Sequence, residues 1–226
     1  MTHLLTYVGR QTSRSDGEAR RVIILEATLR LIVKEGIRGV RHRAVAKEAN
    51  VPLASTTYYF KNIKVLISDS LTYFAEKTLW MNRELENSSF ELINYLSEQE
   101  GTRDEEHLLT YLTQFICEHI REQVRHSDDR ILEMAFHEEA LRNSQLADAI
   151  STLDDSFLAT IKQFFEQLGS STSLADAYQV LGLIKLLEYQ YVMRGNIIED
   201  KIQFEHIVNA SVSKIIGISD LTCMES

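Results

Sequence analysis

The amino-acid sequence predicts an all-α fold, and three observations support this prediction. The chain of 226 residues holds one proline and nine glycines, so it has few of the residues that interrupt helices. Apolar side chains recur every three or four residues along most of the chain, which is the spacing of one helical face. No stretch alternates apolar and polar residues as a half-buried strand would. We therefore expect helices and no sheet.

Residues that favour helix ends divide this pattern into separate helices. Gly36 is expected to end the first helix, and Gly195 and Gly217 the last two. Asn62 suits the N-cap of the fourth helix, and Ser127 with two following aspartates opens the sixth. Besides a short helix just before residue 50, the predicted ranges are 17–34, 53–59, 63–86, 105–125, 127–141, 144–168, 174–193 and 200–216, with a loop at 97–106.

The chain is organised around the stretch 36–60, which we interpret as two short helices joined by a tight turn. Asn50 lies where the chain must turn, and Asn tolerates the left-handed conformation of a helix C-terminus. Pro52, the only proline, needs no N–H partner and suits the start of the helix at 53–59. The inward stripe of the first short helix is formed by Val40, Ala44, Val45 and Ala49.

Hydroxyl-bearing side chains crowd the second short helix, and basic side chains flank it on both sides. Such a surface can offer hydrogen bonds to phosphates and to base edges. A structural helix hairpin without DNA contacts is the alternative interpretation. The hydroxyl-bearing and basic residues are Ser55, Thr56, Thr57, Tyr58 and Tyr59, with Arg41, His42, Arg43, Lys47, Lys61 and Lys64 around them.

The net charge of −9 conceals an uneven distribution. Residues 1–61 contain 11 Lys and Arg against 5 Asp and Glu, whereas residues 62–226 contain 13 against 28. A basic amino-terminal part on an acidic body is the asymmetry expected when only one end of a protein meets DNA. Residues 1–16 are expected to be a flexible arm, in which Arg10 and Arg14 either reach a groove or a phosphate or stay in solvent.

The stretch 36–60 and its flanking helices resemble the DNA-binding domain of TetR-family transcriptional regulators, over about residues 18–75. That family has a Gly-ending first helix, an Arg-x-x-Ala second helix, a Gly-Val turn and a recognition helix that closes in Tyr-x-Phe. Here Asn50 replaces the turn Gly, Ala54 replaces a recognition-helix Gly, and Ile63 occupies the usual lysine position, between Lys61 and Lys64. The matching residues are Gly36, Arg43, Val45, Ala46, Ala49, Val51, Ser55, Tyr58, Tyr59, Phe60 and Leu66.

The resemblance implies that residues 1–62 form a helix-turn-helix domain that binds a double-stranded DNA operator. Arg43, with Thr56 or Thr57, would reach base edges, whereas Phe60 is expected in the core. Phosphate contacts would be found among Ser55, Thr57, Tyr58, Tyr59 and Lys64. The full set of expected DNA-binding residues is Arg41, His42, Arg43, Leu53, Ala54, Ser55, Thr56, Thr57, Tyr58, Tyr59, Lys61 and Lys64.

The resemblance also implies that residues 63–226 form a helical domain for effector binding and dimerisation. A homodimer would form through the last two helices, whose apolar faces would build a four-helix interface with a second copy. The same faces can serve the core of the monomer, and we expect each helix to do both. They are formed by Leu181, Ile184, Leu187, Tyr191 and Val192 and by Ile202, Phe204, Ile207, Val208, Ser211 and Ile215.

By the same resemblance, this domain would enclose a small-molecule effector that is largely apolar. Aromatic and Met side chains suit such a pocket, although ordinary core packing is the alternative for each of them. Lys185 either extends to solvent or pairs with an anionic ligand. The candidate pocket residues are Trp80, Tyr111, Phe115, His119, Met134, Phe136, His137, Phe164, Tyr178 and Tyr189.

Other classes of function have little support in the sequence. The sequence contains no run of about 18 apolar residues, so it predicts no membrane span. The first residues lack the apolar stretch of a secretory signal. We therefore expect a cytoplasmic protein. Cys117 and Cys223 fit no metal spacing. The run His137-Glu138-Glu139 lacks the second histidine of a zinc-protease helix, and no phosphate loop or nucleophile motif occurs. We expect no cofactor, no metal and no catalytic residue.

These observations lead to the hypothesis of a sequence-specific transcriptional regulator, a repressor that a ligand releases from DNA. The alternative is a ligand-independent DNA-binding protein of the same fold, with an architectural or partner-recruiting role. A pocket of about 300 Å³ or more would favour the first hypothesis, and a filled core the second.

Overall fold

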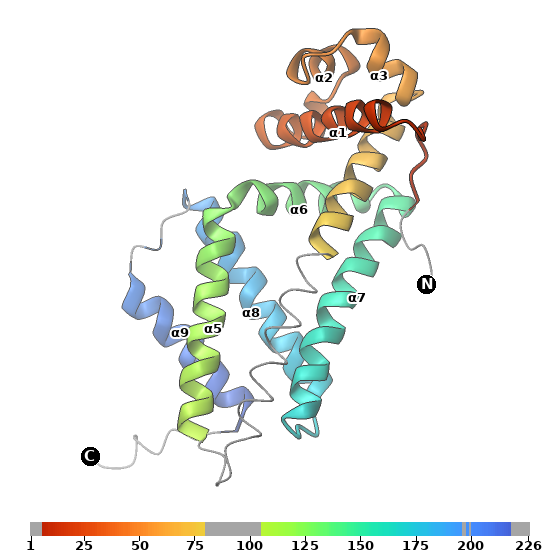
Figure 1. Ribbon diagram of the computed structural model, residues 1–226. Helices are drawn as coiled ribbons and strands as arrows, with labels where there is room; N and C mark the ends of the chain where they lie inside the picture. The colour runs from red at the N-terminus through yellow and green to blue at the C-terminus, as the bar shows by residue number, and fades with distance from the viewer. Residues whose placement is uncertain (1–5, 80–104, 196–197, 199, 218–226) are drawn as a thin grey trace, which may run out of the picture. The chain divides into compact units, whose positions relative to one another are not determined.

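The structure is a computed structural model that describes residues 6–79, 105–195, 198 and 200–217 (Figure 1). Every regular element in these residues is a helix, so the predicted all-α class is confirmed. The elements are α1 (Ser15–Glu35), the 3₁₀ turn η1 (Ile37–Gly39), α2 (His42–Glu48), α3 (Leu53–Tyr59), a helix at 63–79, α5 (Glu105–Arg125), α6 (Ser127–Ala140), α7 (Ser144–Gln167), α8 (Ser173–Met193) and α9 (Lys201–Ile215).

The predicted helix boundaries agree with these elements to within two residues wherever the structure describes both. The N-cap prediction for Asn62 is confirmed, because its Oδ1 accepts a hydrogen bond from the N–H of Val65 at 3.0 Å. Asp200 caps α9 in the same way through the N–H of Gln203, at 2.9 Å. The predicted end of the helix that begins at residue 63 and most of the loop at 97–106 lie outside the described residues.

The chain divides into two compact units. The first consists of Met1–Asn82 and Ile131–Asp154, and the second of Arg83–Arg130 and Asp155–Ser226. Both α6 and α7 therefore contribute residues to each unit. The predicted boundary at residue 62 concerns where DNA binding ends and effector binding begins, so it stays a prediction about function.

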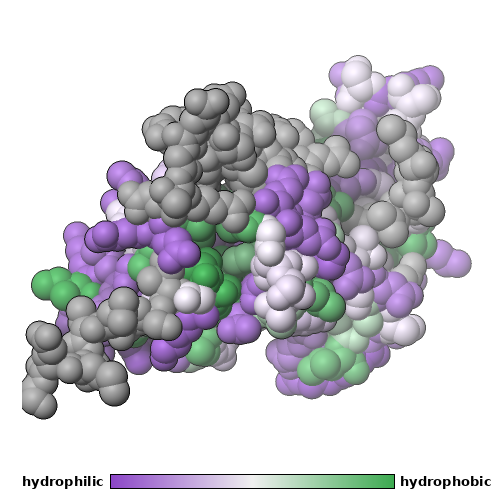
Figure 2. All heavy atoms as spheres, turned by 90° about the horizontal axis from the view of Figure 1, so that it is seen from below, coloured by the Kyte–Doolittle hydropathy of each residue, from purple (hydrophilic) through white to green (hydrophobic). Residues whose placement is uncertain are grey.

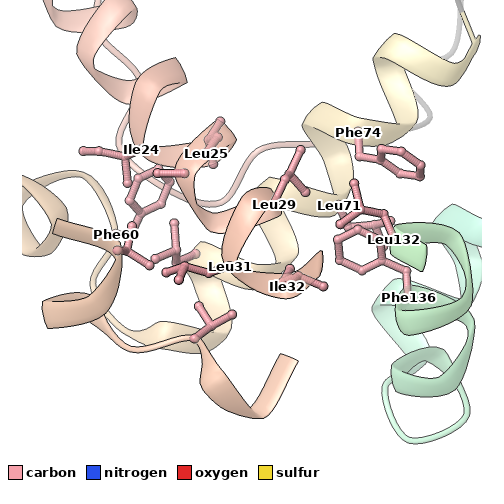
Figure 3. Close-up of a cluster of buried hydrophobic side chains, with 14 of the residues drawn as sticks. Ile24, Leu25, Leu29, Leu31, Ile32, Phe60, Leu71, Phe74, Leu132 and Phe136 are labelled. Carbon is pink, nitrogen blue, oxygen red and sulfur yellow. The ribbon is translucent and has the colours of Figure 1, made fainter. Parts of the chain in front are cut away.

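The core of the first unit joins α1, α3 and the helix at 63–79 to parts of α6 and α7. Ile24 and Leu25 of α1 are fully buried, as is Phe60, which follows α3 directly (Figure 3). Further along, Phe74 contacts Phe136 of α6 with ring centroids 5.8 Å apart. The short helices α2 and α3 lie together on one side of α1 (Figure 1), so this core supports the stretch that the sequence singled out.

The core of the second unit forms where α5 packs against α8 and α9. Of the stripes predicted on α8 and α9, Ile184 and Leu187 are buried in this core, as are Phe204 and Val208. These four residues therefore serve the monomer. Ile202, by contrast, is exposed.

The turn between α2 and α3 takes the form that the sequence predicts. Asn50 has φ of 52°, in the left-handed region, and is the only non-glycine residue with positive φ among the described residues. The N–H of Val51 donates to the carbonyl of Ala46 at 3.0 Å, and the N–H of Asn50 donates to the carbonyl of Lys47 at 3.2 Å. This pair of bonds is a Schellman motif, which satisfies the last carbonyls of α2 and reverses the chain into α3.

We predict that Asn50→Val destabilises the protein by about 1–2 kcal/mol, because a β-branched residue resists the left-handed conformation. Asn50→Gly is the matched control and should leave stability equal or slightly higher, since glycine adopts this φ without strain. Urea unfolding followed by circular dichroism measures both. Equal stability of the two variants would show that the turn does not depend on a left-handed residue.

Candidate functional site

The surface of α2 and α3 presents most of the residues predicted to bind DNA. Arg41 precedes α2, and Arg43 is in its first turn. Lys61 and Lys64 follow α3. The exposed members of the predicted set are Arg41, Arg43, Leu53, Ala54, Thr57, Tyr58, Lys61 and Lys64, whereas His42 and Ser55 are partly buried. These ten residues can approach a ligand from solvent.

Thr56 requires a correction, because it is fully buried. Its hydroxyl donates to the carbonyl of Leu53 at 2.8 Å and lies 3.2 Å from Nδ1 of His42. Since the hydroxyl proton is used within α3, Thr56 accepts from an Nδ1–H of His42. Burial lowers the pKa of His42, so the ring remains neutral at neutral pH. This pair therefore ties α3 to α2, and Thr56 has no free face for a base edge.

Tyr59 also requires a correction. It is buried, and its ring packs edge-to-face on Tyr58 with centroids 5.0 Å apart. The backbone carbonyl of Tyr59 accepts a hydrogen bond from the N–H of Arg10 in the amino-terminal segment. The expected core position of Phe60 is confirmed, since this residue is fully buried. The hydroxyl groups available on α3 are thus those of Ser55, Thr57 and Tyr58.

Four basic side chains of this surface have no carboxylate partner in the part of the chain that the structure describes. Within the described residues, Arg41, Arg43, Lys61 and Lys64 make no ion pair with a carboxylate. Some other basic side chains of the first unit are paired: Glu48 of α2 binds both Arg30 at 3.0 Å and Lys34 at 3.1 Å. The four unpaired cations flank α2 and α3, where a phosphate backbone would meet them.

The amino-terminal segment differs from the prediction of a flexible arm over residues 1–16. Residues 15 and 16 belong to α1, and residues 8–10 donate hydrogen bonds to the carboxylate of Asp69 and the carbonyl of Tyr59. Sequence reasoning missed Asp69. Its only sequence signal is its position three residues after Leu66, which puts an acidic side chain on the same helical face as an apolar one.

A cluster of charged and polar side chains in the second unit is the best candidate for an effector anchor. Glu188 of α8 is buried, and its Oε2 lies 3.1 Å from Nη1 of Arg130 and 4.0 Å from Nζ of Lys185. Nε2 of His119 lies 3.6 Å from the other carboxylate oxygen of Glu188. Burial, followed by the charges of Arg130 and Lys185, lowers the pKa of His119 to about 4. The cluster therefore combines two cations, one anion and a neutral imidazole at neutral pH.

The remaining pocket candidates have different surroundings. Phe136 and Phe164 are buried in the cores of the first and second units, so both serve packing. Tyr178 and Tyr189 are exposed on α8. Tyr111 and Phe115 stack on α5 with centroids 6.4 Å apart. Met134 and His137 belong to the first unit and are partly buried, and Trp80 lies outside the described residues.

Among the described residues, one group has the composition of a metal site: Glu133, His137 and Asp154, whose ligand atoms lie within 4.8 Å of one another. Nδ1 of His137 lies 2.8 Å from the carbonyl of Glu133, so Nδ1 carries the proton, and Nε2 faces a carboxylate oxygen of Asp154 at 3.4 Å. The hydrogen bond to Asp154 raises the pKa of His137. A protonated imidazole that pairs with Asp154 therefore explains this geometry.

The fold and the surface of α3 define a helix-turn-helix DNA-binding protein. The profile of the family described as bacterial regulatory proteins, tetR family, matches residues 24–69. The resemblance seen in the sequence is thus confirmed over residues 24–69, which match this family of bacterial regulatory proteins. No match was found among curated proteins.

Solved structures share the fold over most of the chain. A TetR transcription regulator from Haloarcula marismortui is 16% identical with a TM-score of 0.62, covering 88% of this chain and 97% of the other. GusR of Salmonella enterica is 14% identical with a TM-score of 0.62, covering 91% and 100%. The multidrug binding protein EbrR, complexed with proflavin, is 21% identical with a TM-score of 0.52, covering 87% and 99%.

The pKa of His119 predicts a pH dependence of stability. Its pKa falls from 6.5 to about 4 on folding, so between these values the unfolded chain binds a proton that the folded chain does not. The free energy of unfolding therefore decreases as the pH falls through this window and is independent of His119 above it. We predict that His119→Gln flattens this slope, as measured by urea unfolding from pH 4 to pH 6.5.

His137→Gln is the matched control. Because the pKa of His137 is raised, the contribution of its ion pair is complete below 6.5 and is lost as the pH rises through the folded-state value. The pair is about half exposed, so we expect it to contribute less than about 1 kcal/mol. An unchanged acid slope in His119→Gln, or a flattened one in His137→Gln, would contradict the assignment.

Proposed function

We propose that the protein is a homodimeric repressor that a largely apolar effector releases from its DNA operator. The observation that carries this proposal is the surface of α3: uncompensated cations and exposed hydroxyl groups on a short helix that a Schellman turn holds against α2. Side chains of this kind bind phosphates and base edges when the helix lies in a major groove.

The outer face of α8 supports dimerisation. Positions 174, 178, 182, 186, 189 and 193 lie on one face of the helix, and Leu174, Tyr178, Leu186, Tyr189 and Met193 are all exposed there. Between them, Gly182 is exposed and has open space where a side chain would be. Hydrophobic residues also reach the surface in patches between hydrophilic ones in the view of Figure 2. An exposed apolar stripe of this length suits a helix that packs against its copy in a second subunit.

The cluster around Glu188 supports an effector site in the second unit. A mostly apolar cavity with a few convergent polar groups is the usual form of a small-molecule site. His119, Arg130, Lys185 and Glu188 would supply those groups, with Phe115 on the same helix as His119. The complex of EbrR with proflavin shows that a protein of similar fold binds a small aromatic molecule.

Regulation would follow from the spacing of two DNA-binding units in one dimer. Two copies of α3 must reach successive major grooves, which are about 34–36 Å apart. An effector that binds more tightly when the spacing is wrong shifts the population away from the DNA-bound state. By linkage, DNA must weaken effector binding by the same factor. A dimer whose DNA affinity is unaffected by every bound small molecule would contradict the release mechanism.

We predict that Arg43→Ala lowers the preference for the operator. If Arg43 reads a guanine, discrimination should fall by about 1–3 kcal/mol, because a bidentate contact to the base edge is lost. Fluorescence anisotropy with DNA from upstream of the gene and with a mixed-sequence duplex, across a salt series, measures this ratio. Arg125→Ala, the same change of charge in the second unit, is the control and should have no effect. An unchanged ratio in Arg43→Ala would exclude base reading.

We predict that Leu186→Glu weakens the dimer by at least about tenfold, because the stripe on α8 would bury an unpaired carboxylate at the interface. Gln179→Glu places the same charge at another exposed position of α8 and is the matched control. Sedimentation velocity over a concentration series gives both dissociation constants. Equal constants for the two variants would show that the dimer forms through another surface.

A further inference from the structure

Residues 7–10, which precede the family match at 24–69, are anchored by three successive backbone amides. The N–H groups of Val8 and Gly9 donate to the two carboxylate oxygens of Asp69, at 2.8 and 2.9 Å. The N–H of Arg10 donates to the carbonyl of Tyr59 at 2.8 Å. These three bonds fix the backbone of residues 8–10.

The anchoring carboxylate lies inside the protein. Asp69 is fully buried, and its Oδ2 lies 3.5 Å from Nη2 of Arg21, which is itself 2% exposed. A buried carboxylate is costly unless hydrogen bonds and an opposite charge compensate it. Val8 and Gly9 supply two of the donors that Asp69 needs, so the segment and the buried ion pair depend on each other.

Glycine is the only residue type that fits at position 9 without a shift of its neighbours. A Cβ there would lie 2.7 Å from Oδ2 of Asp69, 2.9 Å from Cδ1 of Phe60 and 3.0 Å from the carbonyl oxygen of Tyr59. Tyr7 adds a further bond, from its hydroxyl to Glu76 at 2.6 Å, and its ring lies under the guanidinium of Arg21. The sequence of this segment is thus specific for the anchored conformation.

The anchor places Arg10 beside the recognition helix. Arg10 is exposed, and its guanidinium carbon lies 4.2 Å from the centroid of the Tyr58 ring on α3. Tyr58 is 54% exposed, so this pair is on the surface that carries the predicted DNA contacts. No carboxylate of the described residues forms an ion pair with Arg10. Stacking on an aromatic face leaves the N–H groups at the edge of the guanidinium free to bind a phosphate.

We propose that residues 7–10 are a fixed DNA-binding arm, in which Asp69 clamps the backbone and Arg10 binds a phosphate next to the end of α3. This proposal rests on DNA binding through α3. It extends the interface to a segment outside the family match. An alternative role, in which the clamp only stabilises the first unit, would leave DNA affinity independent of the charge of Arg10.

The test uses the full-length protein and a fluorescein-labelled mixed-sequence duplex, since a phosphate contact is independent of sequence. Arg10→Gln removes the charge and keeps the backbone anchor. We expect its affinity to fall about threefold to tenfold, and the slope of log affinity on log salt to decrease by about one, because one phosphate contact is lost. Arg20→Gln removes an exposed arginine of α1 and should change neither quantity.

Gly9→Ala tests the clamp while Arg10 is retained. We expect it to weaken DNA binding about as much as Arg10→Gln does, with faster hydrogen exchange at the amides of residues 8–10 and an unchanged rate in the core of α1. Wild-type affinity and salt slope in Arg10→Gln would overturn the arm and leave the proposed function intact. Absence of DNA binding by the wild-type protein, even at low salt, would overturn both.

Discussion

Two helices of seven residues each are too short to be stable alone, and the DNA-binding surface depends on the packing that holds them. Isolated helices shorter than about 12 residues are marginal in water. In this protein α2 contributes Val45, which is fully buried, and the residue after α3 is the fully buried Phe60. Both belong to the same buried cluster as Ile24 and Leu25 of α1. The angle at which α3 presents its outer face is therefore set by the core beneath it and by the turn at Asn50.

The polar groups of the first unit have two different roles, and whether a group is buried or exposed decides which role it has. Buried groups hold the backbone: Thr56 joins α3 to α2, and Asp69 clamps residues 8 and 9. Exposed groups, such as Arg43 and Thr57, have no carboxylate partner in the described residues and remain available to DNA. Because a buried donor or acceptor without a partner is strongly unfavourable, the first group cannot be released to bind a ligand without loss of stability.

Much of the fold could be predicted from the sequence because local chemistry determines where the helices end. Asn50 and Asn62 act through bonds within a few residues of themselves, and the structure shows those bonds. The all-α class and the core position of Phe60 follow from apolar spacing in the same local way. The TetR resemblance added the identity of the helix-turn-helix, which spacing alone does not give.

The site was less predictable because burial and long-range pairing decide it. Thr56 and Thr57 are neighbours of the same type, yet one is buried and the other exposed. Asp69 bonds to residues about 60 positions earlier, and no local pattern indicates that contact. The aromatic candidates for the pocket were likewise divided by tertiary packing between two cores, the exposed face of α8 and the surface of α5.

Hydroxyl-radical footprinting of the operator complex would test most directly whether a dimer places two copies of α3 on DNA. We predict two protected segments whose centres are about 10 base pairs apart, on one face of the duplex, as two recognition helices in successive major grooves require. A single protected segment, or continuous protection of both faces, would contradict this arrangement.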